Sequence, residues 1–287
     1  RVERLVRAFF LERGFRETRT PILVESPGME AHIVPYRTER GASLRTSPEF
    51  SMKELLVGGL EEIFQIATCF RDEPVSATHL PEMTLIEWYR AYADETAIMA
   101  DTEALVATLA TALHGAPLIP FQGAHIDVTP PWPRLRVADL FAEHADIDLQ
   151  ACTLPDAEFF QLWLDKVEPH LPRERAVFVT EYPPEHAALA VVATRADGSR
   201  FARRFEVFAG GLELANAFCE LTDPIEQRAR FARDNPRAKM PVQFLDALAQ
   251  GMPPAAGIAL GLDRLVMLLA DEPDIRFTVW LLPYVEC

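Results

Sequence analysis

The sequence lacks the features that mark membrane, secreted and zinc-binding proteins. It contains no run of about 18 apolar residues and no signal-peptide pattern, so we expect no transmembrane helix. It starts at Arg1 rather than at a methionine, so we expect a few native residues to precede it. Only four cysteines occur, and none are paired at metal-ligand spacing: Cys69, Cys152, Cys219 and Cys287. We therefore expect a reduced, cytoplasmic protein without disulfides.

Basic residues are scarce relative to acidic ones. The chain has 28 Lys and Arg against 43 Asp and Glu, a formal net charge of −15. This balance argues against a broad nucleic-acid-binding surface, which is normally basic, but it allows a local basic patch or a small charged substrate. Ser-His-Asp and Cys-His arrangements are also missing, so no side-chain nucleophile is expected.

The residues that are present suit a folded domain with a large core. Of 287 residues 49% are hydrophobic, enough for one large domain or two modest ones. Apolar periodicity and capping residues predict helices at 2–13, 47–58, 95–113, 156–168 and 263–270. Apolar runs bounded by turn residues predict strands at 15–20, 62–70, 82–89, 176–180, 188–193, 205–208, 212–221 and 257–260.

The order of these segments favours an α+β fold. Strands 62–70 and 82–89 read as a long hairpin, and a second hairpin turns at Gly210-Gly211. Tight turns between consecutive strands are typical of an antiparallel sheet. We therefore predict an antiparallel sheet flanked by helices rather than a parallel dinucleotide-binding sheet.

The strand at 82–89 carries the first candidate site. Met83, Leu85, Glu87 and Tyr89 share one face because strand side chains alternate. A buried carboxylate beside a phenol hydroxyl would make a specific pocket for an ammonium group. The alternative is a polar outer face of the sheet.

Charged residues beside this hairpin suggest an anion site. Arg71 and Glu73 lie where the first strand meets its loop, and arginine suits bidentate binding of phosphate or carboxylate. His79, in the same loop, is a candidate phosphate contact. The alternatives are a surface ion pair and a solvated histidine.

Two glutamates in the last long strand suggest a metal site. Two carboxylates and a nucleotide phosphate commonly hold Mg²⁺. Glu213 and Glu220 have opposite parity, so sharing an ion would need a bulge between them, for example at 215–217. The alternative is that one of these glutamate side chains points into the protein and the other points outward.

A small-residue strand leads into the final helix. Small residues at 257–261 would let a ligand approach the backbone, Asp263 could cap the helix, and Arg264 begins it. Ordinary strand-to-helix packing is the alternative.

These segments together resemble class II aminoacyl-tRNA synthetases. Residues 70–73 (FRDE), 79–84 (HLPEMT) and 87–89 (EWY) resemble motif 2 of that family, and residues 257–264 (GIALGLDR) resemble motif 3. Residues 16–21 with the preceding helix resemble motif 1, the usual dimer-forming element. The chain is most similar to the lysyl branch, with the weakest match over about 95–200.

Within that branch the chain resembles the truncated paralogues that join β-lysine to a lysine of elongation factor P. Residues 46–53 (TSPEFSMK) resemble the ligase form of this helix start, and Ala259 stands where lysyl-tRNA synthetases usually carry glycine. Because Arg1 already lies in the motif 1 helix, we expect residues 1–287 to be a single catalytic domain without an anticodon-binding domain. The resemblance implies ATP and Mg²⁺, a lysine or β-lysine substrate, elongation factor P as acceptor, and a homodimer.

The resemblance also implies residue roles. The amino-acid site would comprise Ser47, Glu49, Glu87, Tyr89, Asn216, Glu220 and Ala259. The ATP site would comprise Arg71, Asp72, Glu73, His79, Met83, Glu213, Leu214, Gly261 and Arg264.

Within these sets each role is specific. Glu87 and Tyr89 would hold the ε-ammonium, Glu49 the other amine, and Asn216 the substrate carboxylate. Arg71 would bridge that carboxylate and the α-phosphate. Glu73 would bind the adenine amine, Glu213 and Glu220 would bind Mg²⁺, and Arg264 would bind the γ-phosphate.

Three residues depart from the family pattern. Thr78 replaces the arginine that contacts the γ-phosphate, Leu80 replaces an asparagine, and Met83 replaces the phenylalanine that stacks on adenine. These changes concern ATP affinity more than amino-acid identity. They leave two rivals open: the catalytic fragment of a lysyl-tRNA synthetase, and a non-catalytic amino-acid-binding module.

A basic segment is a candidate docking surface for the protein acceptor. It contains Arg195, Arg200, Arg203 and Arg204 on a predicted hairpin. The alternative is a solvated hairpin with no partner.

Overall fold

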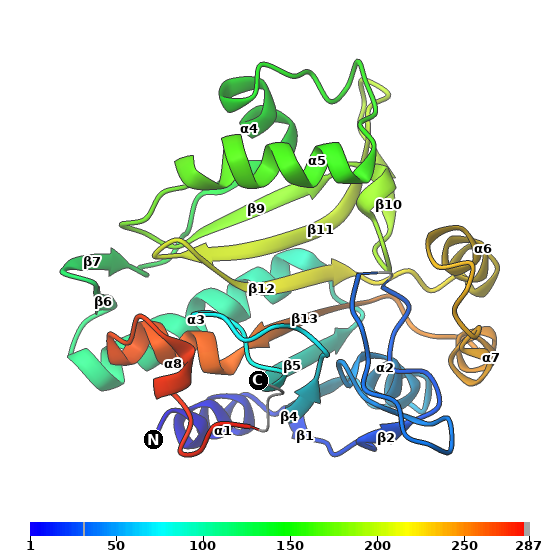
Figure 1. Cartoon of the computed structure of the whole chain (residues 1–287), viewed down its shortest axis with the longest axis horizontal. Helices are drawn as coiled ribbons and strands as arrows, with labels where there is room; N and C mark the ends of the chain where they lie inside the picture. Colours follow the sequence, from blue (N-terminus) through cyan, green and yellow to red (C-terminus); the bar gives the residue numbers. More distant parts are fainter. Residues whose placement is uncertain (31, 284–287) are drawn as a thin grey trace.

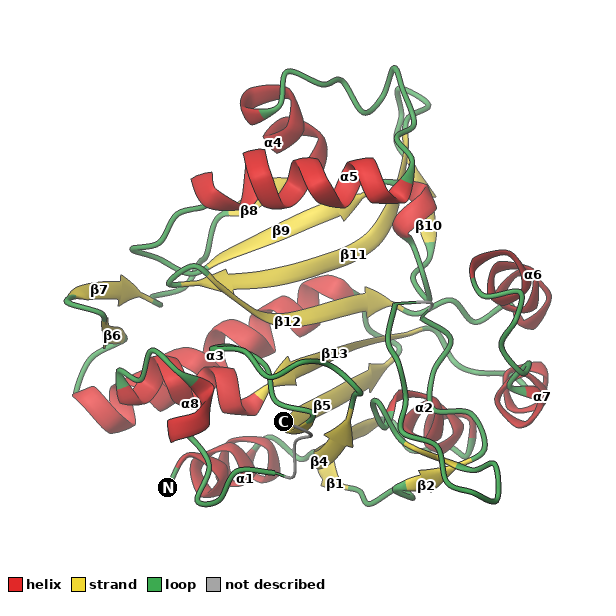
Figure 2. Ribbon diagram, viewed as in Figure 1, coloured by secondary structure: helices red, strands yellow, loops and turns green. Residues whose placement is uncertain are grey.

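A mixed sheet forms the centre of the molecule in the computed structural model, which describes residues 1–30 and 32–283 (Figures 1 and 2). Its strands are β1 (Arg16–Glu17), β4 (Glu62–Phe70), β5 (Glu82–Ala91), β8 (Arg134–Arg136), β9 (Val177–Tyr182), β10 (Val192–Thr194), β11 (Arg200–Ala209), β12 (Leu212–Cys219) and β13 (Ala255–Gly261). The order across the sheet is β1-β4-β5-β13-β12-β11-β9-β8, and β10 pairs with β11. The pairs β1–β4 and β8–β9 are parallel and the other pairs are antiparallel, which confirms the predicted α+β class.

Helices cover both sides of this sheet. They are α1 (Val2–Glu12), α2 (Glu49–Val57), α3 (Glu95–His114), α4 (Val137–His144), α5 (Asp156–Leu162), α6 (Pro224–Asp234), α7 (Val242–Ala249) and α8 (Leu262–Ala270). Figure 1 shows α4 and α5 beside β9 and β11, and α6 and α7 together at the side of α2. Two small hairpins complete the fold, β2 (Leu23–Val24) with β3 (Ser43–Leu44) and β6 (Leu118–Phe121) with β7 (Ala124–Asp127).

The two faces of β5 have different environments. Ile86 and Trp88 are fully buried in the main core, where Phe10 of α1 stacks on Phe64 with ring centroids 4.9 Å apart. The alternate residues on β5, Glu87 among them, lie on the opposite face. The side chain of Glu87 is nevertheless 0% exposed, so this face is not the polar outer surface that strand periodicity allowed.

The predicted hairpins β4–β5 and β11–β12, and the strand-to-helix unit β13–α8, are confirmed with small shifts of their ends. The strand predicted at 188–193 is confirmed only at its end, because Val192–Thr194 pairs with β11 while Ala190 forms an isolated bridge with Glu220. The helix predicted at 156–168 is α-helical only to Leu162 and continues as a π-helical turn and a 3₁₀ turn. Helices α4, α6 and α7 were not predicted: α4 and α7 are only eight residues long, whereas the capping Asp223 and Pro224 at the start of α6 are a local signal that was missed.

Helix α3 is long and apolar enough to cross a membrane by length and composition alone. It instead packs on the sheet, contacting β5, β11, β12 and β13, and buries Leu105, Val106 and Leu109 in the main core. Its apolar composition is therefore explained by burial inside the fold. Cys69, Cys152 and Cys219 are free, and Cys287 lies outside the described residues.

Candidate active site

A cavity of about 420 Å³ is lined by residues of β5, β12 and β13 and by the start of α8. Most of the predicted site residues line it: Ser47, Glu49, Arg71, Glu73, His79, Met83, Glu213, Leu214, Asn216, Ala259, Gly261 and Arg264. Glu87, Tyr89 and Glu220 are almost fully buried and connect to lining residues by hydrogen bonds or ion pairs. Asp72 is the exception: its side chain is exposed outside the cavity, and its backbone N–H donates to Val34 O.

Glu87 forms a polar cluster at one end of the cavity. The Ser47 hydroxyl donates to Glu87 Oε1 over 2.7 Å, and the Tyr89 hydroxyl donates to Oε2 over 3.2 Å. Ser47 Oγ also accepts the N–H of Glu49 at the start of α2, so the helix start fixes the hydroxyl in place. Burial, followed by the nearby Glu49, raises the pKa of Glu87 to about 8. A cation entering this end would stabilise the ionised carboxylate.

Lys53 is a buried cation that sequence reasoning did not single out. Its ammonium lies 2.6 Å from Glu49 Oε1 and 2.5 Å from Glu220 Oε2, and its side chain is 1% exposed. Burial lowers the pKa of Lys53, but Glu220 and Glu49 together raise it above its ordinary value. Lys53 therefore stays charged and links α2 to the end of β12. The signal in the sequence was a lysine placed four residues after a glutamate on one helix face.

Gly257 gives Tyr89 its room on the neighbouring strand. The two residues are partners in the β5–β13 pairing. A Cβ on Gly257 would lie 2.2 Å from the Tyr89 ring and 2.9 Å from Glu220 Oε1. Only a glycine lets the phenol lie flat against β13 at this point.

Arginines form the other end of the cavity. Arg264 donates from Nη1 to Glu213 O over 2.8 Å and from Nε to Thr78 O over 3.1 Å, and its Nη2 lies 2.6 Å from His79 Nε2. Burial, and then the Arg264 charge, lowers the pKa of His79, so this imidazole is neutral at neutral pH. The buried Nε of Arg71 has no hydrogen-bond partner among the described residues. An unpaired guanidinium N–H facing a cavity is a donor that an anionic ligand can satisfy.

Asp263 does not cap α8 as predicted. Its Oδ2 instead accepts the backbone N–H of Thr84 over 2.7 Å, and α8 has no side-chain cap. The carboxylate therefore ties the start of β5 to the helix that carries Arg264. Fixing these two elements together sets the spacing between the hairpin loop and Arg264.

The structure does not bring Glu213 and Glu220 together on one metal ion. Seven residues of extended chain separate them, roughly 20 Å of strand, and Glu220 is already paired with Lys53. A bulge does occur, but at Leu214, where the pairing of β12 with β11 skips one residue. It turns Glu213 toward the face that carries Asn216.

Glu206 of β11 is the carboxylate that accompanies Glu213. Both line the cavity from adjacent strands, and Glu213 pairs with Phe208, two residues after Glu206. Burial, and then the Glu206 charge, raises the pKa of Glu213 to about 7. Glu206 in turn accepts from Tyr182 over 2.6 Å and from Arg204 over 2.5 Å. This pair, unlike Glu213 with Glu220, could take part in holding a divalent cation with phosphate oxygens.

The three departures from the family pattern have different environments. Leu80 is buried in an apolar cluster with Met267 and Ile275, so it secures the loop. Thr78 lines the cavity and supplies the carbonyl that accepts from Arg264 Nε. Met83 also lines the cavity and packs beside Leu85.

The arginines proposed as a docking surface do not form one patch. Arg204 faces the cavity, where it donates to Asn216 Oδ1 over 3.1 Å. Arg203 is paired with Glu95 at 2.5 Å, and Arg195 is paired with Glu181. Adjacent strand residues point to opposite faces, which divides this basic segment.

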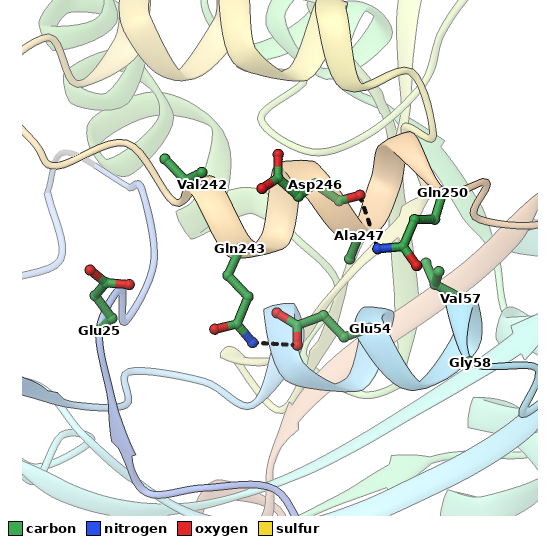
Figure 3. A pocket seen from close by; sticks show the side chains of 9 residues that line it. All are labelled: Glu25, Glu54, Val57, Gly58, Val242, Gln243, Asp246, Ala247 and Gln250. Atoms are coloured by element: carbon green, nitrogen blue, oxygen red, sulfur yellow. Dashed lines mark hydrogen bonds between the residues drawn. The ribbon is translucent and has the colours of Figure 1, made fainter.

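A larger hollow of about 650 Å³ lies between α2 and α7, away from these residues (Figure 3). Glu54 accepts from Gln243 there over 2.9 Å, and Figure 3 shows the acidic side chains Glu25 and Asp246 at its rim. No predicted site residue lines this hollow in the part of the chain that the structure describes. The predicted site residues therefore gather at the smaller cavity.

Comparison with known families agrees with this geometry. The family model described as tRNA synthetases class II (D, K and N) matches residues 1–284. The chain belongs to this class II family. The hairpin β4–β5 and the unit β13–α8 carry the residues that resemble motifs 2 and 3 of this family.

Relatives of this class II chain bear two kinds of name. It is 38% identical to a lysine–tRNA ligase of Moorella thermoacetica, over 96% of this chain and 62% of that protein. It is 36% identical to an elongation factor P–(R)-beta-lysine ligase of Hamiltonella defensa, over 94% of this chain and 89% of that protein. A lysine–tRNA ligase of Chloroflexus aurantiacus is 35% identical over 100% of this chain and 64% of its own length. The chain thus spans a little over 60% of the length of these lysine–tRNA ligases.

Proposed function

We propose that the protein is an ATP-dependent ligase that activates lysine or β-lysine as an aminoacyl-adenylate. The observation that carries this proposal is the opposite charge of the two ends of one cavity. Buried carboxylates at one end suit ammonium groups, while the unpaired Arg71 donor and Arg264 at the other suit phosphates. The names of the relatives agree with a lysine-type substrate.

The chemistry needs positioning and charge stabilisation rather than a nucleophilic side chain. The substrate carboxylate would attack the α-phosphorus in line, and pyrophosphate would leave. Arg71 would bridge the two reacting groups, and Arg264 would stabilise charge on the phosphates. Asn216 and Arg204, joined by a 3.1 Å hydrogen bond, would orient the substrate carboxylate.

A divalent cation fits the donor set at the arginine end. Glu213 and Glu206 would hold Mg²⁺ there, since the raised pKa of Glu213 marks a carboxyl that a cation would stabilise. When bound, the ion would neutralise phosphate charge. Ordinary cytoplasmic concentrations of ATP and Mg²⁺ would supply both groups.

For the second half-reaction we propose transfer to a lysine amine of elongation factor P. The name of the Hamiltonella relative supports this acceptor, and so does Ala259, whose methyl group lines the cavity where lysyl-tRNA synthetases usually carry glycine. The rival acceptor is tRNA, which the names of the other relatives favour. A non-catalytic amino-acid-binding module is the second rival.

The test uses the full-length protein with ATP, Mg²⁺ and either L-lysine or (R)-β-lysine. We expect mass spectrometry of elongation factor P to show addition of one lysyl residue, about 128 Da, and ATP–pyrophosphate exchange to depend on the same amino acid. Arg71→Ala is the matched control and should abolish both signals. Aminoacylation of tRNA-Lys without modification of elongation factor P would overturn the acceptor assignment. The lack of pyrophosphate exchange by a folded protein would overturn the ligase itself.

We also propose a homodimer formed through α1 and the adjoining sheet edge. β1 is the edge strand of the sheet, and Leu11, Ile22 and Leu23 nearby are 42–56% exposed. An edge strand beside apolar side chains favours pairing with a second copy. Light scattering should give twice the chain mass, and Leu11→Glu should halve it. A wild-type monomer at micromolar concentration would contradict the dimer.

A further inference from the structure

One carboxylate in the cavity has no role in the reaction described above. Glu30 lies on the segment between β2 and β3 and lines the cavity together with Glu49 and Arg71. A Cβ on Gly28 would lie 2.5 Å from Glu30 Oε2, so the glycine gives this carboxylate its place. No lysine, arginine or histidine forms an ion pair with Glu30 among the described residues, although the Arg71 charge and the backbone N–H groups of Glu30 and Met29 each lower its pKa.

Charge balance at this end of the cavity separates its carboxylates into two groups. Lys53 compensates Glu49 and Glu220, each within 2.6 Å. Among the described residues, Glu87 accepts from two neutral hydroxyls and Glu30 has no ion-pair partner. The buried Glu87 and the partly buried Glu30 therefore lack a paired cation there, although the charge of Arg71 acts on both, and they come from different elements, β5 and the connection between β2 and β3. Uncompensated buried carboxylates are costly unless a ligand supplies the opposite charge.

Resting on the proposed function, we infer that Glu30 determines specificity by binding the second ammonium group of a diamino acid. Glu87 receives the terminal ammonium, and Glu30 with Glu49 receives the amine nearer the substrate carboxylate. Two carboxylates from different segments can hold that amine over a wider range of positions than one, which suits a cavity that accepts an α- or a β-amine. Burial, and then the adjacent Glu49 charge, raises the pKa of Glu30, as expected for a carboxyl whose cation is the ligand.

The experiment compares ligands that lack one amine at a time. The dissociation constants of L-lysine, (R)-β-lysine, 6-aminohexanoate and norleucine are measured by calorimetry for the full-length protein and for Glu30→Gln. We expect Glu30→Gln to weaken the binding of lysine, β-lysine and norleucine by at least about 10-fold. Binding of 6-aminohexanoate, which lacks the second amine, should change less than about twofold. Glu30→Asp should restore part of the loss.

Two controls separate this inference from the proposed function. Glu25 lies on the same segment as Glu30 and forms an exposed ion pair with Lys239. Glu25→Gln should therefore leave the dissociation constant of every ligand unchanged. Glu87→Gln should weaken the binding of lysine and 6-aminohexanoate but leave the binding of norleucine unchanged. If Glu30→Gln weakened the binding of lysine and of 6-aminohexanoate equally, or weakened neither, the role of Glu30 would be overturned while the proposed ligase activity would stand. A wild-type protein that binds none of the four would overturn both.

Discussion

Replacing Glu87 with glutamine should weaken lysine binding by about 10- to 100-fold and leave ATP binding unchanged. The substitution keeps the shape and the partners Ser47 and Tyr89 but removes the charge that, on our proposal, would face the ε-ammonium. A hydrogen bond to a charged group contributes about 1.5–3 kcal/mol, which sets the expected loss. Calorimetric titration with L-lysine and, separately, with ATP measures both affinities. Unchanged lysine affinity would show that the terminal ammonium binds elsewhere.

The same substitution should stabilise the free protein at higher pH. Burial raises the pKa of Glu87 to about 8, above the unfolded value of about 4.3. Between these values the folded state holds a proton that the unfolded state has lost, so the free energy of unfolding decreases as pH rises. Glutamine cannot ionise and avoids this decrease. The melting temperature of Glu87→Gln should therefore rise relative to that of the wild type as the pH increases from about 5 to about 8. A difference in melting temperature that stayed constant over this range would contradict the raised pKa.

Replacing Lys53 with methionine should destabilise the protein by about 3–5 kcal/mol. The substitution leaves the buried Glu220 and the neighbouring Glu49 without their cation, and an unpaired buried charge costs about that much. The free energy of unfolding from urea titration should decrease accordingly, and the melting temperature should fall by on the order of 10 °C. The sequence has only three lysines, so Lys53 can be compared with another lysine of known environment.

Lys239→Met is the matched control for Lys53→Met. Lys239 pairs with Glu25, but both side chains are more than 60% exposed, so its loss should cost less than about 1 kcal/mol. The double variant Lys53→Met, Glu220→Met should recover part of the lost stability, because the buried carboxylate leaves with its cation. Equal effects of the two lysine substitutions, or no recovery in the double variant, would show that the Lys53 ion pairs do not determine stability here.

Local patterns in the sequence were enough to predict the elements that carry the chemistry. The β4–β5 hairpin, the β11–β12 hairpin and the β13–α8 unit are long, strongly patterned and bounded by turn residues such as Gly210. Such elements depend mainly on their own residues and near neighbours. Helix α7 packs on the distant α2, so its place depends on tertiary contacts, whereas α6 begins with a capping Asp223 and Pro224, a local signal that was missed.

In the candidate site too, some features followed from local sequence and others depended on tertiary contacts. Alternation along β5 was sufficient to place Glu87 and Tyr89 on one face, but alternation could not tell a buried face from an exposed one. That depends on α2, which packs against β5 from another part of the sequence. The bulge at Leu214 turns Glu213 toward the face of Asn216 and Glu206, while the length of strand between Glu213 and Glu220 keeps those two apart. One extra residue reverses the direction of every side chain beyond it, so counting parity failed.

The sequence by itself determined the family, the α+β class and most of the residues that line the cavity, because motif residues keep their order and spacing along local elements. The tertiary structure alone decided which charges meet. Lys53 and Glu220 are 167 residues apart in the sequence, yet they form an ion pair, whereas Glu30 has no ion-pair partner among the described residues. Charges interact through space at distances of a few ångströms, so their balance depends on how separate segments pack and not on the pattern within any one of them.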